Sequence, residues 1–248
     1  METLAVFHIL KNGGTTLVDR YKHNSGFAYQ RVENEIVLNY QQPNQYKLLV
    51  NDCQEQKLKL IFGHGVNFTW NNRLQNSVKY ATILRDPVAR IISAYNYFRL
   101  EMITVHNHIT DIDFTTWIIN CDKMFPTPVY AQYQQFSKQT HLRTDYGRKI
   151  DIWRELDLYT EAIENVEQLS YVFFMEDNYL KHFDTVAQSY DVLPDTSVTH
   201  QHSTKSSLAS HGLEYLTYEQ LNNTELQLLN ETVEKDIDFY NHCKEQFE

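Results

Sequence analysis

A lysine, two glycines and two threonines follow directly on an apolar run near the start of the chain, in the order Val6-Phe7-His8-Ile9-Leu10-Lys11-Asn12-Gly13-Gly14-Thr15-Thr16. Glycines let a backbone approach an anion closely, and the N–H groups at a helix start carry positive dipole charge. Gly13 and Gly14 meet that requirement, while the hydroxyls of Thr15 and Thr16 can cap the helix or donate to phosphate oxygens. Lys11 adds a compact positive charge. The stretch therefore predicts a seat for a phosphoryl or sulfuryl group.

The order of these residues differs from that of the nucleotide P-loop. In Gly-x-x-x-x-Gly-Lys-Ser/Thr the lysine follows the glycines, whereas Lys11 precedes Gly13 and Gly14. An ordinary Gly-Gly turn is the alternative interpretation, because short glycine motifs often match by chance.

An arginine and a serine form the second candidate pair. Arg85 follows the apolar run 80–84, and Ser93 falls on the helix that we expect next, with Asp86 as its N-cap and Pro87 at its first position. Open α/β folds bind ligands at the carboxyl ends of their strands, so Arg85 and Ser93 could reach one anion there. Alternatively, Arg85 pairs with a neighbouring carboxylate and Ser93 faces solvent.

A histidine between two glycines ends a third apolar run, Leu58-Lys-Leu-Ile-Phe-Gly-His-Gly65. Gly63 and Gly65 leave room for a ligand beside His64. Imidazole has an unperturbed pKa of about 6.5 and can take a proton from a hydroxyl near neutral pH. His64 is therefore a candidate general base, and a hydrogen-bonded histidine in a tight turn is the alternative.

Strand and helix patterns alternate along the chain, which is typical of an α/β fold. Strands are predicted just before Lys11, within 27–40 with a turn near 33–35, and at 58–65, 80–84 and 169–175. Helices are predicted at 17–21, 87–98, 114–120, 150–165, 179–190 and 217–247 with a break near 222–223, and polar loops at 41–45 and 199–210. We expect one domain, residues 1–248, with a three-layer α/β/α fold around a mainly parallel sheet of about five strands.

Two of these motifs together resemble the sulfotransferases that use 3′-phosphoadenosine-5′-phosphosulfate (PAPS), within them the carbohydrate group that includes the heparan sulfate 2-O- and 6-O-sulfotransferases. The stretch 8–16 is similar to their 5′-phosphosulfate loop and the stretch 84–93 to their 3′-phosphate motif, and both their order and their separation match. Asn12 departs from the pattern, because many members carry Thr there. The backbone cradle is unaffected, whereas one hydroxyl contact is in doubt.

The resemblance implies a role for each matching residue. Lys11, with residues 12–16, would hold the phosphosulfate, and Arg85 and Ser93 would anchor the 3′-phosphate. His64 stands where the uronyl 2-O-sulfotransferases have a catalytic histidine, and it would deprotonate the acceptor hydroxyl. No metal is implied.

Relatives also have a loop late in the chain that closes over the adenosine and the 3′-phosphate. Ser203, Thr204 and Lys205 are the candidates for that loop here, and a plain linker is the alternative. The implied acceptor is a hydroxyl compound, a carbohydrate by resemblance to the group. A kinase using ATP and Mg²⁺, and a catalytically silent nucleotide- or glycan-binding module, are the competing functions.

Composition limits the partners and the compartment. The formal net charge of −10 over 248 residues argues against a general binder of nucleic acid or of anionic membranes. We find no apolar run that could span a bilayer and no signal peptide, and three widely spaced cysteines fit a reducing compartment. We expect a soluble, cytoplasmic, bacterial protein; a trimmed Golgi-lumenal domain is the alternative.

Overall fold

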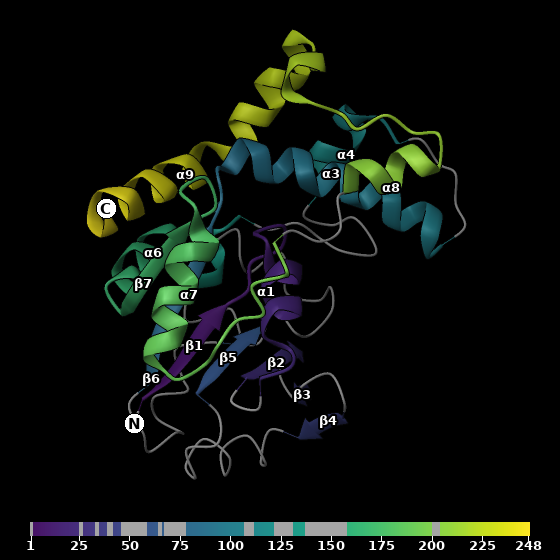
Figure 1. Ribbon diagram of the computed structural model, residues 1–248. Helices are drawn as coiled ribbons and strands as arrows, with labels where there is room; N and C mark the ends of the chain where they lie inside the picture. Colours follow the sequence, from purple (N-terminus) through teal and green to yellow (C-terminus); the bar gives the residue numbers. More distant parts are fainter. Residues whose placement is uncertain are drawn as a thin grey trace.

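The computed structural model describes residues 2–24, 27–32, 35–38, 42–45, 59–63, 66, 78–106, 112–121, 131–136, 158–199 and 204–248. Within these ranges the chain forms one seven-stranded sheet with helices on both sides (Figure 1). The strand order is β4-β3-β2-β5-β1-β6-β7.

Five neighbouring strands of this sheet are parallel: β2 (Phe27–Val32), β5 (Leu60–Gly63), β1 (Thr3–Phe7), β6 (Val78–Leu84) and β7 (Leu169–Phe174). β1 is central, and its last residue, Phe7, is in register with Gly63 of β5 and Thr82 of β6. The segments that follow these three strands therefore leave the sheet at the same edge. The predicted parallel sheet of about five strands is confirmed.

The other two strands, β3 (Glu35–Leu38) and β4 (Gln42–Gln45), are antiparallel and form one edge. The prediction of a polar loop at 41–45 was wrong for residues 42–45, because these residues pair with β3 as an edge strand, and residue 41 lies outside the described residues. An edge strand pairs on one side only and therefore tolerates a proline such as Pro43.

Side chains of β1 alternate between two cores, which is why the molecule has three layers. Leu4 and Val6 pack toward α1 (Gly14–Tyr21) and α7 (Tyr179–Ser189) on one face. Ala5 and Phe7 pack toward η2 (Tyr133–Phe136), α6 (Leu158–Val166) and the end of α9 (Asn223–Phe247) on the other. All five residues of β1 are buried, as a central parallel strand covered on both faces requires. The predicted α/β/α layering is confirmed.

A third core lies beyond the sheet and consists of helices. It joins α3 (Pro87–Thr104), α4 (Phe114–Asn120) and the first half of α9, with Tyr95, Phe114 and Trp117 packed ring against ring. In Figure 1, α3 lies on the side of the sheet to which the arrows of β1 and β5 point. The helical core therefore covers the edge where the candidate site residues leave the strands.

The late part of the chain contains a helix that the sequence did not predict. Residues 204–210, expected to be a polar loop, form α8, which packs along α3 and buries Leu208. The predicted break near 222–223 is confirmed, because Asn222 caps α9 by accepting hydrogen bonds from Thr224 N and Glu225 N. Within the described ranges, no helix combines the length and the apolar character needed to cross a membrane.

Candidate functional site

The loop between β1 and α1 has an unusual backbone. Lys11 and Gly13 both adopt the left-handed region, with φ of 70° and 75°. Left-handed residues next to a helix start orient successive N–H groups toward one point, which makes a concave anion site. Gly13 is the N-cap of α1 and brings no side chain to its amides. The left-handed conformation costs a lysine roughly 1–2 kcal/mol, a cost that recurs at functional sites.

Both glycines of this loop are also required by their neighbours. A Cβ on Gly14 would lie 1.9 Å from His8 Nε2, and one on Gly13 would lie 2.5 Å from the hydroxyl of Tyr179. The His8 ring is itself packed on Phe62 of β5, with ring centroids 4.6 Å apart. The glycines thus permit a close approach of α1 to the sheet edge as well as the loop conformation.

The two threonines of the loop have different surroundings. Thr16 is buried, and its side chain is hydrogen-bonded to that of Tyr179 at the start of α7. Thr15 is exposed at the first turn of α1. Of the two hydroxyls expected to meet an anion, Thr15 is therefore the one at the surface, while Thr16 joins α1 to α7.

Asn12 points into the protein. Its side-chain amide donates to Ile83 O of β6 and to Gln132 Oε1, both at 2.7 Å, and the residue is 1 % exposed. Asn12 thus fastens the loop to the neighbouring strand, a contact that a threonine hydroxyl, with a single hydrogen, could not make twice.

The second predicted motif meets the first. Arg85 follows β6, and its Nη1 donates to Lys11 O at 3.2 Å. Next to it, Asp86 caps α3 by accepting from Ala89 N at 2.8 Å, and Pro87 occupies the first helical position, as predicted. The guanidinium of Arg85 is thereby brought to the loop between β1 and α1.

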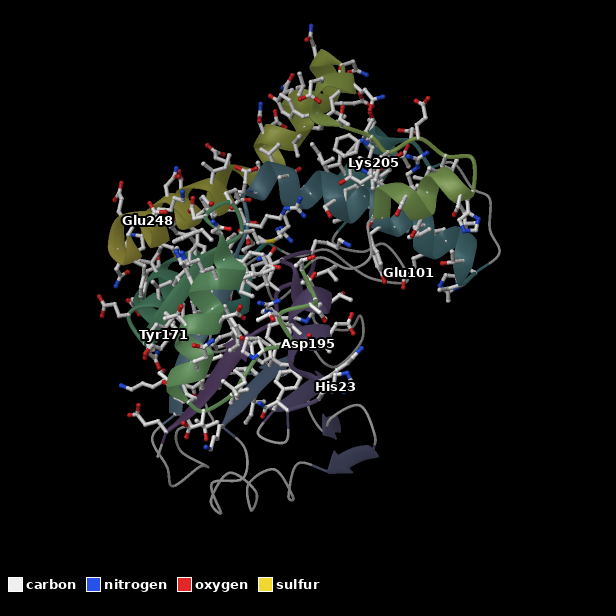
Figure 2. The ribbon with its side chains drawn as sticks, viewed as in Figure 1. His23, Glu101, Tyr171, Asp195, Lys205 and Glu248 are labelled. Atoms are coloured by element: carbon white, nitrogen blue, oxygen red, sulfur yellow. The ribbon has the colours of Figure 1, made fainter. Side chains whose placement is uncertain are left out.

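Burial and Arg85 lower the pKa of Lys11 to about 8, since both disfavour its charged form, while Glu101 opposes them. The ammonium lies 4.0 Å from the centre of the Tyr97 ring on α3, a cation–π contact. Figure 2 shows Glu101 extending from α3 toward the side of the molecule that holds the sheet and α1. Two cations, Lys11 and Arg85, therefore share one sheet edge, and an anion between them would relieve their repulsion.

The far end of α1 is anchored by a buried ion pair. Arg20 Nε donates to Asp184 Oδ1 of α7 at 2.9 Å, and Tyr21 donates its hydroxyl to the same oxygen at 2.6 Å. Arg20 Nη1 also donates to Asp195 O at 3.2 Å, on the segment that leads toward α8. These contacts fix the helix whose N-terminus carries the candidate anion site.

The remaining predicted residues are only partly placed. Ser93 is 7 % exposed in the second turn of α3. Thr204 and the exposed Lys205 begin α8 beside α3 (Figure 2). His64 and Ser203 lie outside the described residues, so their predicted roles stay predictions.

A cavity of about 690 Å³ opens at the carboxyl end of β7, next to the loop. It is lined by residues 175–180 and 182, among them Met175 and Tyr179, the two side chains nearest to Gly13. Glu176 in its wall accepts hydrogen bonds from Asp86 N at 3.1 Å and from the Tyr240 hydroxyl at 2.9 Å. Among the described residues, no cluster of His, Cys, Asp and Glu could hold a metal ion.

Sequence reasoning missed three side chains at this edge: Tyr97, Gln132 and Tyr179. Tyr179 and Tyr97 lie on helices, where the spacing of aromatic residues is typical of the hydrophobic core. Gln132 follows a segment that has no helical or strand periodicity. No local pattern marks them, because their importance comes from contacts with residues far away in the chain.

A sulfotransferase from Alicyclobacillus acidocaldarius aligns over 97% of this chain and 99% of its own, with 12% sequence identity and a TM-score of 0.40. No protein-family model matches the chain. No curated protein matches it either. At this identity and TM-score, the alignment establishes neither a family nor an activity for the chain.

Proposed function

We propose that this protein is a sulfotransferase that moves the sulfuryl group of PAPS to a hydroxyl of an acceptor, a carbohydrate. The observation that carries the proposal is the meeting of the two motifs: the Arg85 guanidinium donates to the carbonyl of Lys11, beside the N-terminus of α1. A donor with a 5′-phosphosulfate and a separate 3′-phosphate needs two such neighbouring anion sites.

In the proposed reaction, the acceptor oxygen forms a bond to sulfur while the bond from sulfur to the bridging phosphate oxygen breaks. The electron pair of that bond leaves on the phosphate of 3′-phosphoadenosine-5′-phosphate (PAP), and His64 accepts the proton of the hydroxyl. Lys11 and the amides of residues 13–16 stabilise the charge that grows on the departing oxygens. The leaving phosphate needs no proton, because Lys11 neutralises the charge that it gains.

The other predicted residues hold the donor. Arg85 and Ser93 bind the 3′-phosphate, and Ser203, Thr204 and Lys205 close over the adenosine side. A guanidinium suits this task, because it binds phosphate through two parallel hydrogen bonds.

The first experiment is calorimetric titration of the wild type with PAP and, separately, with ATP and Mg²⁺. We expect PAP to bind, ATP with Mg²⁺ to bind more weakly, and Arg85→Ala to weaken PAP binding by about 10–100-fold, the range for a lost charged hydrogen bond. Arg99→Ala is the matched control, because Arg99 donates to Glu214 O from the far half of α3. Preference for ATP with Mg²⁺ would favour the kinase, and no nucleotide binding by a folded sample would remove the proposal.

The second experiment tests the base. His64→Ala should lower turnover with labelled PAPS by about 10²–10⁴-fold, the usual contribution of general-base catalysis, while PAP affinity stays unchanged. His23→Ala, at an exposed position after α1, is the control. Equal loss of turnover and of donor binding in the His64 variant would contradict the assignment, and a wild type that binds PAP but turns over no acceptor would indicate the silent module.

A further inference from the structure

Gln132 lies between the two motifs and touches both. It precedes η2, is fully buried, and accepts hydrogen bonds at Oε1 from Asn12 Nδ2 at 2.7 Å and from Arg85 N at 3.2 Å. Its own Nε2 donates to Arg85 O at 2.8 Å. One side chain thus holds the loop through Asn12 and both backbone polar groups of Arg85.

The hydrogen-bond partners of Gln132 determine which way its side-chain amide is oriented. The two groups facing Gln132 Oε1 are N–H donors, and the group facing Nε2 is a carbonyl, so the opposite amide orientation would set donors against donors. Asn12 is oriented by the same logic, since its amide nitrogen faces two acceptors. Only an uncharged amide of this length satisfies all three partners of Gln132.

The backbone of Gln132 is fixed as firmly as its side chain. Gln132 N and Tyr133 N donate to the carboxylate of Asp236 on α9 at 2.9 and 3.2 Å. Arg90 on α3 donates to the same carboxylate at 3.0 Å, and both members of this ion pair are at most 2 % exposed. The backbone of Gln132 is therefore held by α9, through a carboxylate that is itself paired with Arg90 of α3, while the side chain of Gln132 holds the backbone of Arg85.

We propose that Gln132 is a positioning residue that sets the place of Arg85 relative to the loop 8–14, and so selects a donor that carries a second phosphate. The inference rests on the proposed function, because it assigns the spacing of the two proposed anion sites to one side chain. The physical reason is that Arg85 stands outside both β6 and α3, where neither a strand ladder nor a helix fixes its backbone. Gln132 supplies that restraint.

The test compares two nucleotides, PAP and AMP, which differ by the 3′-phosphate. Affinities are measured by calorimetry for the wild type, Gln132→Met, Arg85→Ala and the double variant. We expect Gln132→Met to weaken PAP binding by about tenfold or more and AMP binding by less than about threefold. In the Arg85→Ala background the same change should alter PAP affinity by no more than about twofold, the usual scatter of independent sites.

Gln220→Met is the matched control. Gln220, the last residue of η4 (Tyr218–Gln220), likewise accepts from a backbone amide, Thr217 N at 2.8 Å, but it does so at an exposed position. It should leave both affinities unchanged. If Gln132→Met fails to fold, Gln132→Asn carries the same comparison, because it keeps the amide and withdraws it by one methylene.

Two results overturn the inference. One is wild-type affinity for PAP in a Gln132 variant, and the other is an equal loss with and without Arg85, which would mean that Gln132 acts only through general stability. Both differ from a failure of the proposed function, in which the wild type itself does not bind PAP.

Discussion

The two turns at the sheet edge connect the same kinds of element but differ in how the start of the following helix is capped. Each runs from a buried parallel strand directly into a helix, from β1 to α1 and from β6 to α3. At the first turn the N-cap is Gly13, left-handed and without a side chain. At the second, the Asp86 carboxylate already accepts from Ala89 N, Asp86 N is bound to Glu176, and Pro87 has no N–H to offer.

Because of this difference, we expect backbone amides to hold an anion at the first turn and a side chain to hold one at the second. The first turn can present the amides of residues 13–16 to an anion, because its N-cap, Gly13, has no side chain that could accept from them. The second turn neutralises its helix start with a carboxylate, so an anion there must be held by the side chain of Arg85. Amides fixed by the fold need no ordering when charge develops, which suits the proposed site of the reacting group.

The largest effect should come from filling the first turn. Gly14→Ala would place a Cβ 1.9 Å from His8 Nε2. Overpacking of this kind typically costs 1–3 kcal/mol, and we expect roughly that loss in the free energy of unfolding, with PAP binding weakened by about 100-fold or more as the loop is displaced. Chemical denaturation and calorimetry measure the two quantities.

Two further variants sharpen that result. Gly212→Ala introduces a side chain where no atom lies within 4 Å, but at a left-handed φ of 74° that Gly14 does not have, so it should cost about 1–2 kcal/mol of backbone strain and leave PAP affinity unchanged. Adding His8→Ala to Gly14→Ala should recover part of the stability. A Gly14→Ala protein as stable as the wild type would contradict the packing described here.

Removing the charge of the first turn should have the next largest effect. Lys11→Met should weaken PAP binding at pH 7 by about 10–100-fold, since it removes a charged contact. In the wild type, PAP affinity should fall as the pH rises above about 8, because Lys11 with its lowered pKa then loses its proton unless an anion holds it. Calorimetry across pH 6.5–9.5 tests this, and an equal decline in Lys11→Met would disprove it.

The lowered pKa of Lys11 should make PAP affinity fall with rising pH but make the stability of the free protein increase. The free protein holds fewer protons on Lys11 than the unfolded chain does between pH 8 and the ordinary value of 10.5, so this residue makes the free energy of unfolding rise over that window. Below pH 8 its buried charge opposes folding. Lys11→Met should therefore raise the Tm at pH 7, whereas Lys22→Met, which removes a partner of Asp19, should not.

The smallest effect on binding should come from the cap of the second turn. Asp86→Ala removes the acceptor for Ala89 N and should cost about 1 kcal/mol in the free energy of unfolding. PAP affinity should stay level or rise slightly, because a negative charge next to Arg85 is lost. Asp113→Ala, which removes the equivalent cap of α4, is the control for stability. A large loss of PAP affinity in Asp86→Ala alone would contradict the view that the second turn holds an anion only through the side chain of Arg85.

Local sequence determined the parts of this protein that depend on neighbours in the chain. The cap and first position of α3, the strand before Lys11, the break before α9 and the three-layer order of elements follow from capping chemistry and periodicity, which act within a few residues. The two candidate anion motifs were identified in the same way, because each is a continuous stretch.

Only the tertiary structure decided how those motifs are supported. Asn12 belongs to the predicted loop, yet its side chain faces Ile83 and Gln132, and Gln132 reaches Arg85 across 47 positions of sequence. β4 and α8 run through polar segments that carry no pattern of their own, and pairing with β3 and packing on α3 decide their structure. A buried amide is satisfied by whichever distant group the fold brings to it, and no local rule of composition or spacing contains that information.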